Sequence, residues 1–280
     1  KIADFAIPSI LAEARSLLKQ LGDRGVPLAG ATSLVFMPGE DAKTAVDITR
    51  IGLSGIRRSN GSFSIGATTP ISDLQKYHEA GWVLDRVALR FVTQQLRNIA
   101  TLGGNIARVF PWADFPIALL ALGAEMVVAS DAVRQAYADD FFASQPARLF
   151  KPGDLLTEIR VPAVASPTGF GYRKETRAAS GFSLSTAAVL LELEGRQLKK
   201  ARVAIGSCIP MPARIPALEQ ALTGEPARPE ALRAAIPVTL NGLRFKEADG
   251  MSSEYIRHLT EVIVGDALEE AVREAKGGNP

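Results

Sequence analysis

The chain has 280 residues and a formal net charge of +2, with 32 Lys and Arg residues against 30 Asp and Glu residues spread along the sequence. This length allows a large core and more than one domain, whereas the dispersed charge excludes the basic patch that nucleic-acid binding requires. One cysteine, Cys208, excludes an intrachain disulfide framework and any four-cysteine iron–sulfur or zinc site in this chain, and we expect it to be a small half-buried residue.

The first elements along the chain indicate a helix followed by short strands. Apolar residues at three- and four-residue spacing predict a helix over 10–21, and a short buried strand follows at 26–29. This strand ends in the small-residue turn Gly30–Leu34, where backbone amides can hold a phosphate. A further strand is expected at 45–48.

The next segment combines a hairpin with helices. Asn60-Gly61 is a hairpin dipeptide between alternating residues, and it predicts paired strands on either side. A cap at Ser72 and Asp73 predicts a helix through Tyr77, and the apolar pattern over 83–99 predicts one continuous helix.

The segment Thr101-Leu102-Gly103-Gly104-Asn105 is the most informative part of the sequence. Adjacent glycines let the backbone turn sharply, so several amides can converge on an anion such as a diphosphate. Asp114 is expected to cap the helix at 115–122. From these residues alone, a simple Gly-Gly turn before a core helix is an equal alternative. The pairing with the Gly30–Leu34 turn favours a phosphate site held from two sides.

The second half begins with strands and ends in helices. Strands are predicted at 124–129 and 155–162, and a linker at 163–169 divides the chain. Further strands are expected at 171–174, 185–193 and 198–206, before a proline-interrupted helical region that ends in a helix over 256–275. We expect a cytoplasmic protein without a membrane span, because no run of about 18 apolar residues is present and Lys1–Phe5 lacks the apolar core of a signal peptide.

Six segments in order resemble the FAD-binding medium subunit of the molybdenum hydroxylase family, which includes xanthine dehydrogenase and carbon monoxide dehydrogenase. The resemblance covers nearly the whole chain. The matching segments are Ala29–Leu34, Ile65–Ala67, Thr101–Leu122, Asp140–Phe142 with Leu155–Ile159, Tyr172 with Lys174 and Arg177, and Gly250 with Glu254, Tyr255 and Leu259.

The resemblance implies an α+β protein with an FAD-binding domain at 1–165 and a C-terminal domain at 170–280. The first domain would consist of two α/β subdomains of the PCMH type, at about 1–56 and 57–165. The second would be an α+β domain, similar to the CO dehydrogenase flavoprotein C-terminal domain, with a three-stranded sheet and helices.

The same resemblance implies the cofactor site. The diphosphate of FAD would lie between the two small-residue loops, Asp114 would accept hydrogen bonds from the ribityl or adenosine part, and Lys174 would lie near the flavin. The residues that it assigns to the cofactor are Leu28, Ala29, Gly30, Ala31, Thr32, Ser33, Leu34, Thr101, Leu102, Gly103, Gly104, Asn105, Ala113, Asp114, Ile159 and Lys174.

Three positions depart from the family pattern. Ala31 replaces a glycine and Ser33 an aspartate in the first loop, while Gly181 replaces the aspartate before an aromatic residue, here Phe182. A non-glycine residue at position 31 requires a negative φ or backbone strain. We expect FAD binding to survive with altered affinity.

The function implied is electron transfer within a molybdenum hydroxylase complex. A large subunit with molybdopterin would oxidise the substrate, a small subunit with two [2Fe–2S] clusters would relay electrons, and FAD in this chain would pass them to NAD⁺, a quinone or oxygen. The assembly would be a heterotrimer or a pair of heterotrimers. Because the substrate would be oxidised in another subunit, we expect no catalytic residue and no metal ligand in this chain. The expected position of His78 and His258 on helix surfaces is consistent with the absence of a general base.

Two other classes remain open from the sequence. A stand-alone FAD oxidoreductase of a related fold, such as an alcohol oxidase or enolpyruvyl reductase, needs acid–base residues or a flavin-linking histidine, for which no candidate lies near the glycine loops. A scaffold subunit that has lost its flavin is favoured only by the changes at Ala31 and Ser33. The substrate and the electron acceptor are not legible in this chain.

Overall fold

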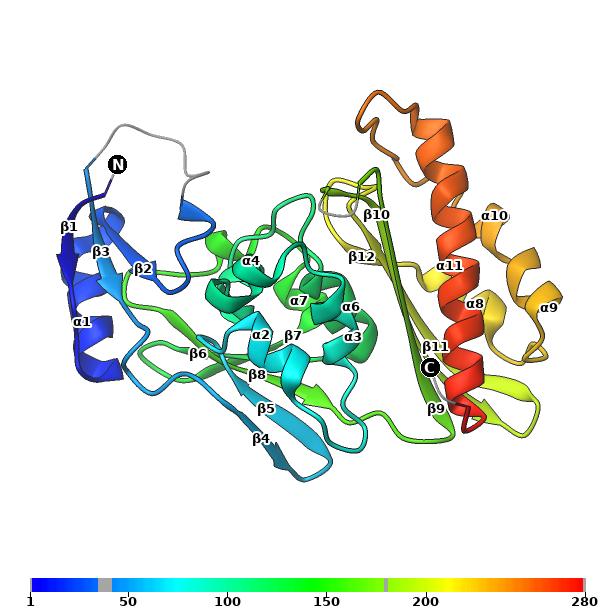
Figure 1. Cartoon of the computed structure of the whole chain (residues 1–280), viewed down its shortest axis with the longest axis horizontal. Coiled ribbons are helices and arrows are strands. Elements are labelled where there is room, and N and C mark those ends of the chain that lie inside the picture. Colours follow the sequence, from blue (N-terminus) through cyan, green and yellow to red (C-terminus); the bar gives the residue numbers. More distant parts are fainter. Residues whose placement is uncertain (1, 35–41, 179–180, 279–280) are drawn as a thin grey trace.

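Three sheets follow one another along the long axis of the molecule, in the order of the sequence (Figure 1). The structure is a computed structural model and describes residues 2–34, 42–178 and 181–278. No helix in these ranges is both long and apolar enough to cross a lipid bilayer. The mixed α+β class expected from the sequence is confirmed.

The first sheet is parallel and carries one helix. Its strand order is β1-β3-β2, and its elements are β1 (Ile2–Ala6), α1 (Leu11–Leu21), the 3₁₀ turn η1 (Gly22–Arg24), β2 (Gly25–Leu28) and β3 (Lys43–Asp47). Ala14 and Leu18 of α1 pack into a small core with Val46 of the central strand. Strand β2 lies at the edge of the sheet, which is the position where a proline such as Pro27, without an amide hydrogen, is tolerated. Only Val26 of this strand is buried, so the expected buried strand is an edge strand.

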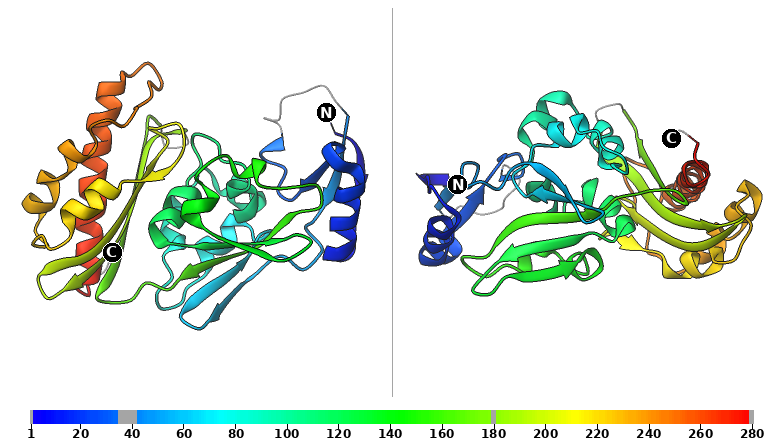
Figure 2. Two further views of the ribbon diagram at one scale, coloured as in Figure 1. Left: turned by 180° about the vertical axis from the view of Figure 1, so that it is seen from behind. Right: turned by 90° about the horizontal axis from the view of Figure 1, so that it is seen from below.

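The second sheet is antiparallel throughout, with strand order β4-β5-β8-β6-β7. Its strands are β4 (Ile56–Ser59), β5 (Ser62–Gly66), β6 (Glu125–Ala129), β7 (Arg134–Tyr137) and β8 (Leu155–Pro162). The helices of this part are α2 (Ile71–Lys76), α3 (Leu84–Leu89), α4 (Gln94–Ile99), α5 (Leu102–Ile106), α6 (Phe115–Leu122), α7 (Ala138–Phe141) and the 3₁₀ turn η3 (Pro146–Arg148). Figures 1 and 2 show helices α2 to α6 gathered on one face of this sheet.

Helix α6 lies between the second and third sheets. All eight of its residues are buried, which is the pattern of a helix covered on every side. Its side chains share one core with Phe63 and Ile65 of the second sheet and with Phe170 and Ala188 of the third. The helix therefore belongs to the packing of both halves of the chain.

The third sheet has the order β12-β11-β10-β9 and packs against the long C-terminal helix. Its elements are β9 (Thr168–Thr176), β10 (Ser183–Glu194), β11 (Gln197–Gly206), β12 (Ala213–Arg214), α8 (Pro216–Leu222), α9 (Pro229–Ala234), α10 (Ile236–Thr239) and α11 (Ser253–Ala275). The expected three-stranded sheet corresponds to the long strands β9, β10 and β11. The observed sheet has a fourth strand, because the two-residue β12 pairs with β11 at one edge. Gly169 and Gly171 let α11 approach β9 closely, because a Cβ at either position would overlap a carbonyl oxygen of that helix.

Some local predictions were wrong. The single helix expected over 83–99 is divided into α3 and α4, and Thr93 starts the second by accepting a hydrogen bond from the Leu96 N–H at 3.4 Å. Cys208 is fully buried rather than half-buried. His78 lies in a loop instead of a helix, although both histidines are exposed as expected.

Candidate functional site

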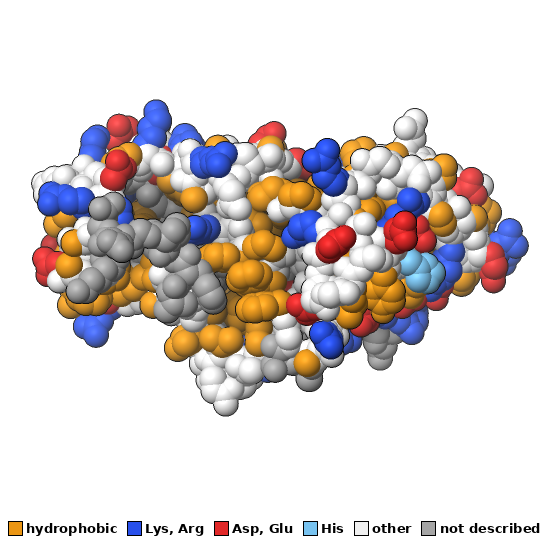
Figure 3. All heavy atoms as spheres, turned by 90° about the horizontal axis from the view of Figure 1, so that it is seen from above, with side chains coloured by type: hydrophobic (Ala, Val, Ile, Leu, Met, Phe, Trp, Pro, Cys, Tyr) orange, Lys and Arg blue, Asp and Glu red, His pale blue; other side chains and the backbone are white. Residues whose placement is uncertain are grey.

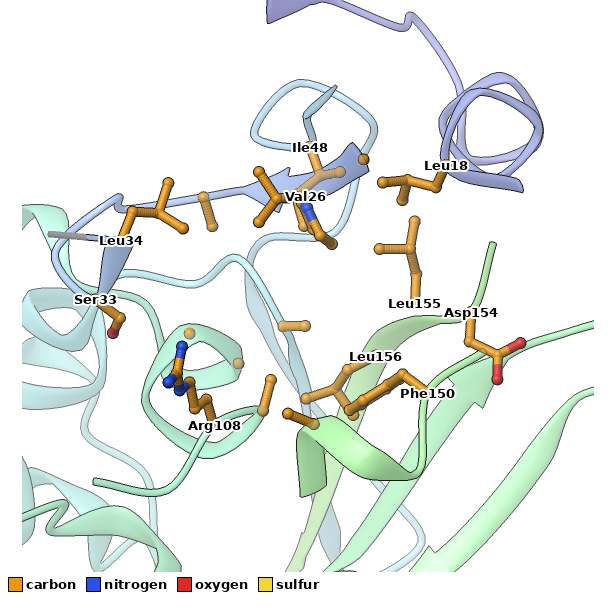
Figure 4. A pocket seen from close by; sticks show the side chains of 18 of the residues that line it. Leu18, Val26, Ser33, Leu34, Ile48, Arg108, Phe150, Asp154, Leu155 and Leu156 are labelled. Carbon is orange, nitrogen blue, oxygen red and sulfur yellow. The ribbon is translucent and has the colours of Figure 1, made fainter. Parts of the chain in front are cut away.

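A cleft of about 420 Å³ separates the first sheet from the helices of the second part. The two small-residue loops lie on its walls, together with apolar side chains from several elements (Figure 4). Leu18, Val26 and Ile48 contribute from the side of the first sheet, and Phe150 and Leu156 from the opposite side. The size and the largely apolar lining are typical of a site for a small organic ligand.

The first loop has a backbone conformation that leaves its amides available. Gly30 packs so tightly that a Cβ would overlap the carbonyl oxygen of Ile99. Ala31 adopts the left-handed region with φ 58°, and its carbonyl accepts a hydrogen bond from the Leu34 N–H at 3.0 Å. Within the described residues, the backbone N–H groups from Gly30 to Ser33 have no hydrogen-bond acceptor. Successive unpaired amides of this kind are suited to an anion.

The second loop is the first turn of α5 rather than an open Gly-Gly turn. Thr101 is its N-cap, and its Oγ1 accepts a hydrogen bond from the Gly104 N–H at 3.1 Å. The Gly103 N–H donates to the Ala67 carbonyl at 2.8 Å, and a Cβ on Gly103 would lie 2.6 Å from that oxygen. The amides of both glycines are therefore paired within the chain, which differs from the expected cradle of free donors.

The structure brings nine of the sixteen expected cofactor residues together around the cleft. These are Ala29, Gly30, Ala31, Thr32, Ser33, Leu34, Thr101, Gly103 and Gly104. Leu28, Leu102, Asn105, Ala113, Asp114, Ile159 and Lys174 do not line it. Leu102, Ala113 and Ile159 are buried in the core, and Asn105 accepts a hydrogen bond from the Phe115 N–H at 3.4 Å.

Asp114 and Lys174 form a separate buried cluster with Tyr172. Lys174 Nζ lies 2.9 Å from Asp114 Oδ2 and donates a second hydrogen bond to the Arg90 carbonyl at 3.2 Å. The Tyr172 hydroxyl donates to Asp114 Oδ1 at 2.9 Å. Asp114 occupies the N-cap position of α6 but its side chain caps no amide, so the expected helix cap was wrong. Its carboxylate instead joins the start of α6 to strand β9.

Burial dominates the protonation of this cluster. It raises the pKa of Asp114 above its ordinary value, although the charge and hydrogen bond of Lys174 oppose the shift. It also raises the pKa of Tyr172 well above its ordinary value, and the Asp114 carboxylate adds to that shift. Tyr172 thus remains a hydrogen-bond donor.

Sequence reasoning missed the remaining polar residues of the cleft. Arg108 extends into it from the C-terminal side of α5, toward the loop that carries Ser33 (Figure 4). Asp154 lies on the far wall, where it accepts from Arg134 Nη2 at 2.6 Å and from the Lys151 N–H at 3.0 Å. Arg108 stands four residues after Gly104, just beyond the end of α5, and this short separation in sequence was the available signal.

Comparisons with known proteins assign the chain to a family. Residues 1–164 match the family described as the FAD binding domain in molybdopterin dehydrogenase, and residues 170–271 match the CO dehydrogenase flavoprotein C-terminal domain. The chain belongs to the molybdopterin dehydrogenase FAD-binding family. It is a medium FAD subunit of the molybdenum hydroxylase type, as its sequence segments indicated, and its relatives are subunits of dehydrogenases.

Two curated relatives and one solved structure illustrate the similarity. The carbon monoxide dehydrogenase medium chain of Hydrogenophaga pseudoflava is 32% identical over 83% of this chain and 84% of its own length. The corresponding chain of Afipia carboxidovorans is 28% identical over 98% of both. The crystal structure of a cyanide-inactivated Cu,Mo-CO dehydrogenase contains a chain that superimposes with a TM-score of 0.91, at 26% identity, over 98% of this chain and 99% of that one.

Proposed function

We propose that this FAD-binding medium subunit holds the diphosphate part of FAD in the cleft between Gly30–Leu34 and the start of α5. The observation that carries the proposal is the close packing of two glycines at that cleft, where Gly30 and Gly103 have no room for a Cβ. The loop from Gly30 to Ser33 offers four consecutive amides without an acceptor in the described residues, which suits an anionic ligand.

We propose that different residues of the site bind different parts of FAD. The loop amides face the anion, while Val26, Ile48 and Leu156 give the cleft an apolar wall that excludes water from a planar ring or a ribose face. Asp114, Tyr172 and Lys174 are proposed to orient the part of the cofactor that extends toward β9. Two hydrogen bonds, to the Arg90 carbonyl and to Asp114 Oδ2, hold Lys174 Nζ in place beside strand β9.

We further propose a role in electron transfer within a larger enzyme. Bound FAD accepts electrons singly and releases them in pairs. A small partner subunit with two [2Fe–2S] clusters would supply the electrons, a large molybdopterin subunit would oxidise the substrate, and NAD⁺, a quinone or oxygen would be the acceptor. The two relatives named as carbon monoxide dehydrogenase medium chains, and the similar chain in a solved Cu,Mo-CO dehydrogenase, support such an assembly. Assembly as a heterotrimer, paired or not, in the cytoplasm is part of the proposal.

The first test blocks the cleft without removing a buried contact. Ser33 is half-buried and its side chain lies at the cleft (Figure 4), so Ser33→Tyr fills the space from one wall. We purify the wild-type chain both alone and together with the subunits that accompany it. Each preparation should show flavin absorbance, and heating should release the bound flavin, which is then identified as FAD. The variant should fold with an unchanged circular dichroism spectrum and carry little flavin.

The matched control is Ser59→Tyr, which adds the same ring to an exposed strand residue away from the cleft. It should retain full FAD. Equal FAD content in Ser33→Tyr and Ser59→Tyr would exclude the cleft as the site, and a folded wild-type chain that takes up no flavin in either form would favour a scaffold role. Copurifying iron and molybdenum would distinguish a complex subunit from a stand-alone flavoenzyme, and reoxidation of the reduced complex by NAD⁺, a quinone or oxygen would identify the acceptor.

A further inference from the structure

Arg108 is a cleft arginine without an ionic partner in the described part of the chain. Its guanidinium lies over the Phe110 ring, 5.4 Å from the ring centroid, and no described carboxylate forms an ion pair with it. The side chain is partly shielded from solvent and extends between the two loops (Figure 4). Arginines that are shielded in this way usually have a carboxylate or a phosphate opposite them.

Apart from Arg108, the groups around the cleft do not neutralise the negative charge of a bound diphosphate. The Gly103 and Gly104 amides are already paired with Ala67 and Thr101, so they are not free for the anion. The other acidic and basic groups on the lining are placed differently: Asp154 is paired with Arg134, while Asp23 and Lys151 are exposed to solvent. A diphosphate carries two negative charges, and neutral backbone amides alone do not cancel them.

We propose that Arg108 is the counter-charge for the diphosphate of the bound dinucleotide. This inference rests on the proposed FAD site and adds a binding residue to it. The planar guanidinium matches two phosphate oxygens at once, which a lysine ammonium does not do. The Phe110 ring supports the guanidinium from one face and leaves its N–H edge available.

The test removes the bound flavin from the wild type and from each variant and then compares their dissociation constants for added FAD. It uses the full chain, either alone or with its accompanying subunits, whichever preparation binds FAD. Arg108→Gln should weaken FAD binding about ten- to hundredfold, the range expected for the loss of charge-assisted hydrogen bonds. Arg108→Lys should recover only part of that loss. The dissociation constant of the wild type should rise with ionic strength more steeply than that of Arg108→Gln.

Lys151→Gln is the matched control, because it removes one positive charge from the rim of the same cleft. It should change FAD binding less than threefold by screening arguments. All variants should keep a thermal midpoint close to that of the wild type, because neither the Arg108 nor the Lys151 side chain forms an ion pair among the described residues and Arg108 loses only its contact with the Phe110 ring.

Two results would overturn the inference while leaving the FAD site intact. One is an Arg108→Gln chain that binds FAD within about threefold of the wild type. The other is a loss in Lys151→Gln equal to that in Arg108→Gln, which would assign the effect to the overall charge of the cleft. A wild-type chain that binds no FAD would instead refute the proposed function itself, and the counter-charge role with it.

Discussion

Replacing Lys174 by methionine should destabilise the protein strongly, because it leaves the Asp114 carboxylate buried without its cation. The two side chains are 5% and 2% exposed and their charged atoms lie 2.9 Å apart. Removing one partner of such a buried pair costs about 3–5 kcal/mol. For a chain of this size each kcal/mol shifts the thermal midpoint by about 2 °C, so Lys174→Met should lower it by about 6–10 °C at neutral pH.

The effect should depend on pH in a defined direction. Burial already raises the pKa of Asp114 in the folded protein, and removing Lys174 raises it further. A carboxyl group with a raised folded-state pKa gives most stability below its unfolded pKa, and that stability is lost as the pH rises through the folded-state pKa. The deficit of Lys174→Met should therefore shrink as the pH falls from 8 toward 5, which thermal unfolding by circular dichroism without flavin measures directly.

Two controls separate this cause from general damage. Lys199→Met removes an exposed lysine that pairs with Glu192 at 2.6 Å, and it should lower the thermal midpoint far less than Lys174→Met does, because water already screens that pair. The double variant Asp114→Asn with Lys174→Met removes both charges and should recover much of the loss. A Lys174→Met deficit that is the same at pH 5 and pH 8, or no larger than that of Lys199→Met, would refute the reasoning.

Three further outcomes test the site and its surroundings. Gly30→Ala should weaken FAD binding at least about tenfold in an equilibrium titration, because its Cβ meets the Ile99 carbonyl and the loop must move; unchanged affinity would argue against a tightly fixed loop. Ala31→Gly removes the strain of a φ of 58° and should raise the thermal midpoint by about 1–3 °C, whereas a lower midpoint would show that no strain is stored there. The Cys208 thiol, whose pKa is raised by burial, should react with a disulfide reagent at pH 8 only after unfolding in urea, and rapid reaction of the native protein would contradict its burial.

Local sequence patterns located the elements of the cleft but not the partners of its atoms. Glycine pairs and small residues mark backbone turns because they report on local φ and on space for a Cβ, so both loops were found. The pairing of Gly103 with Ala67 is a contact between segments far apart in sequence, and no local pattern contains it. The expected free amides were therefore wrong for the second loop, while the first loop has them within the described residues.

The cluster around Asp114 also contains contacts between distant segments that local sequence patterns do not reveal. The sequence placed Asp114 before an apolar helix, where an aspartate is usually a cap. Its partners lie about 60 residues away on β9, in a part of the chain joined to it only by the tertiary fold. The sequence therefore indicates that Asp114 matters at this position, but its bridge to Tyr172 and Lys174 depends on the tertiary structure. Likewise local sequence patterns indicated no role for Arg108, because its position on the cleft wall depends on segments far apart in the chain. The domain limits at 1–165 and 170–280 stay a prediction.

Because α6 is completely buried, the chain should tolerate neither truncation after its first part nor exchange of one part with that of a related protein. One side of that helix is covered by residues before the linker, and the other by strands β10 and β11 after it, which contribute Ala188 and Ala204 to the same core. A fragment that ends near residue 165 would present an apolar stripe and an unneutralised Asp114 to water, and we expect it to aggregate rather than fold. Although two family descriptions divide the chain near this point, residues of both parts share the core around α6, and we expect the two parts to unfold together. Recombination between related genes should therefore preserve the two parts together, and exchanging one alone should require compensating changes along α6.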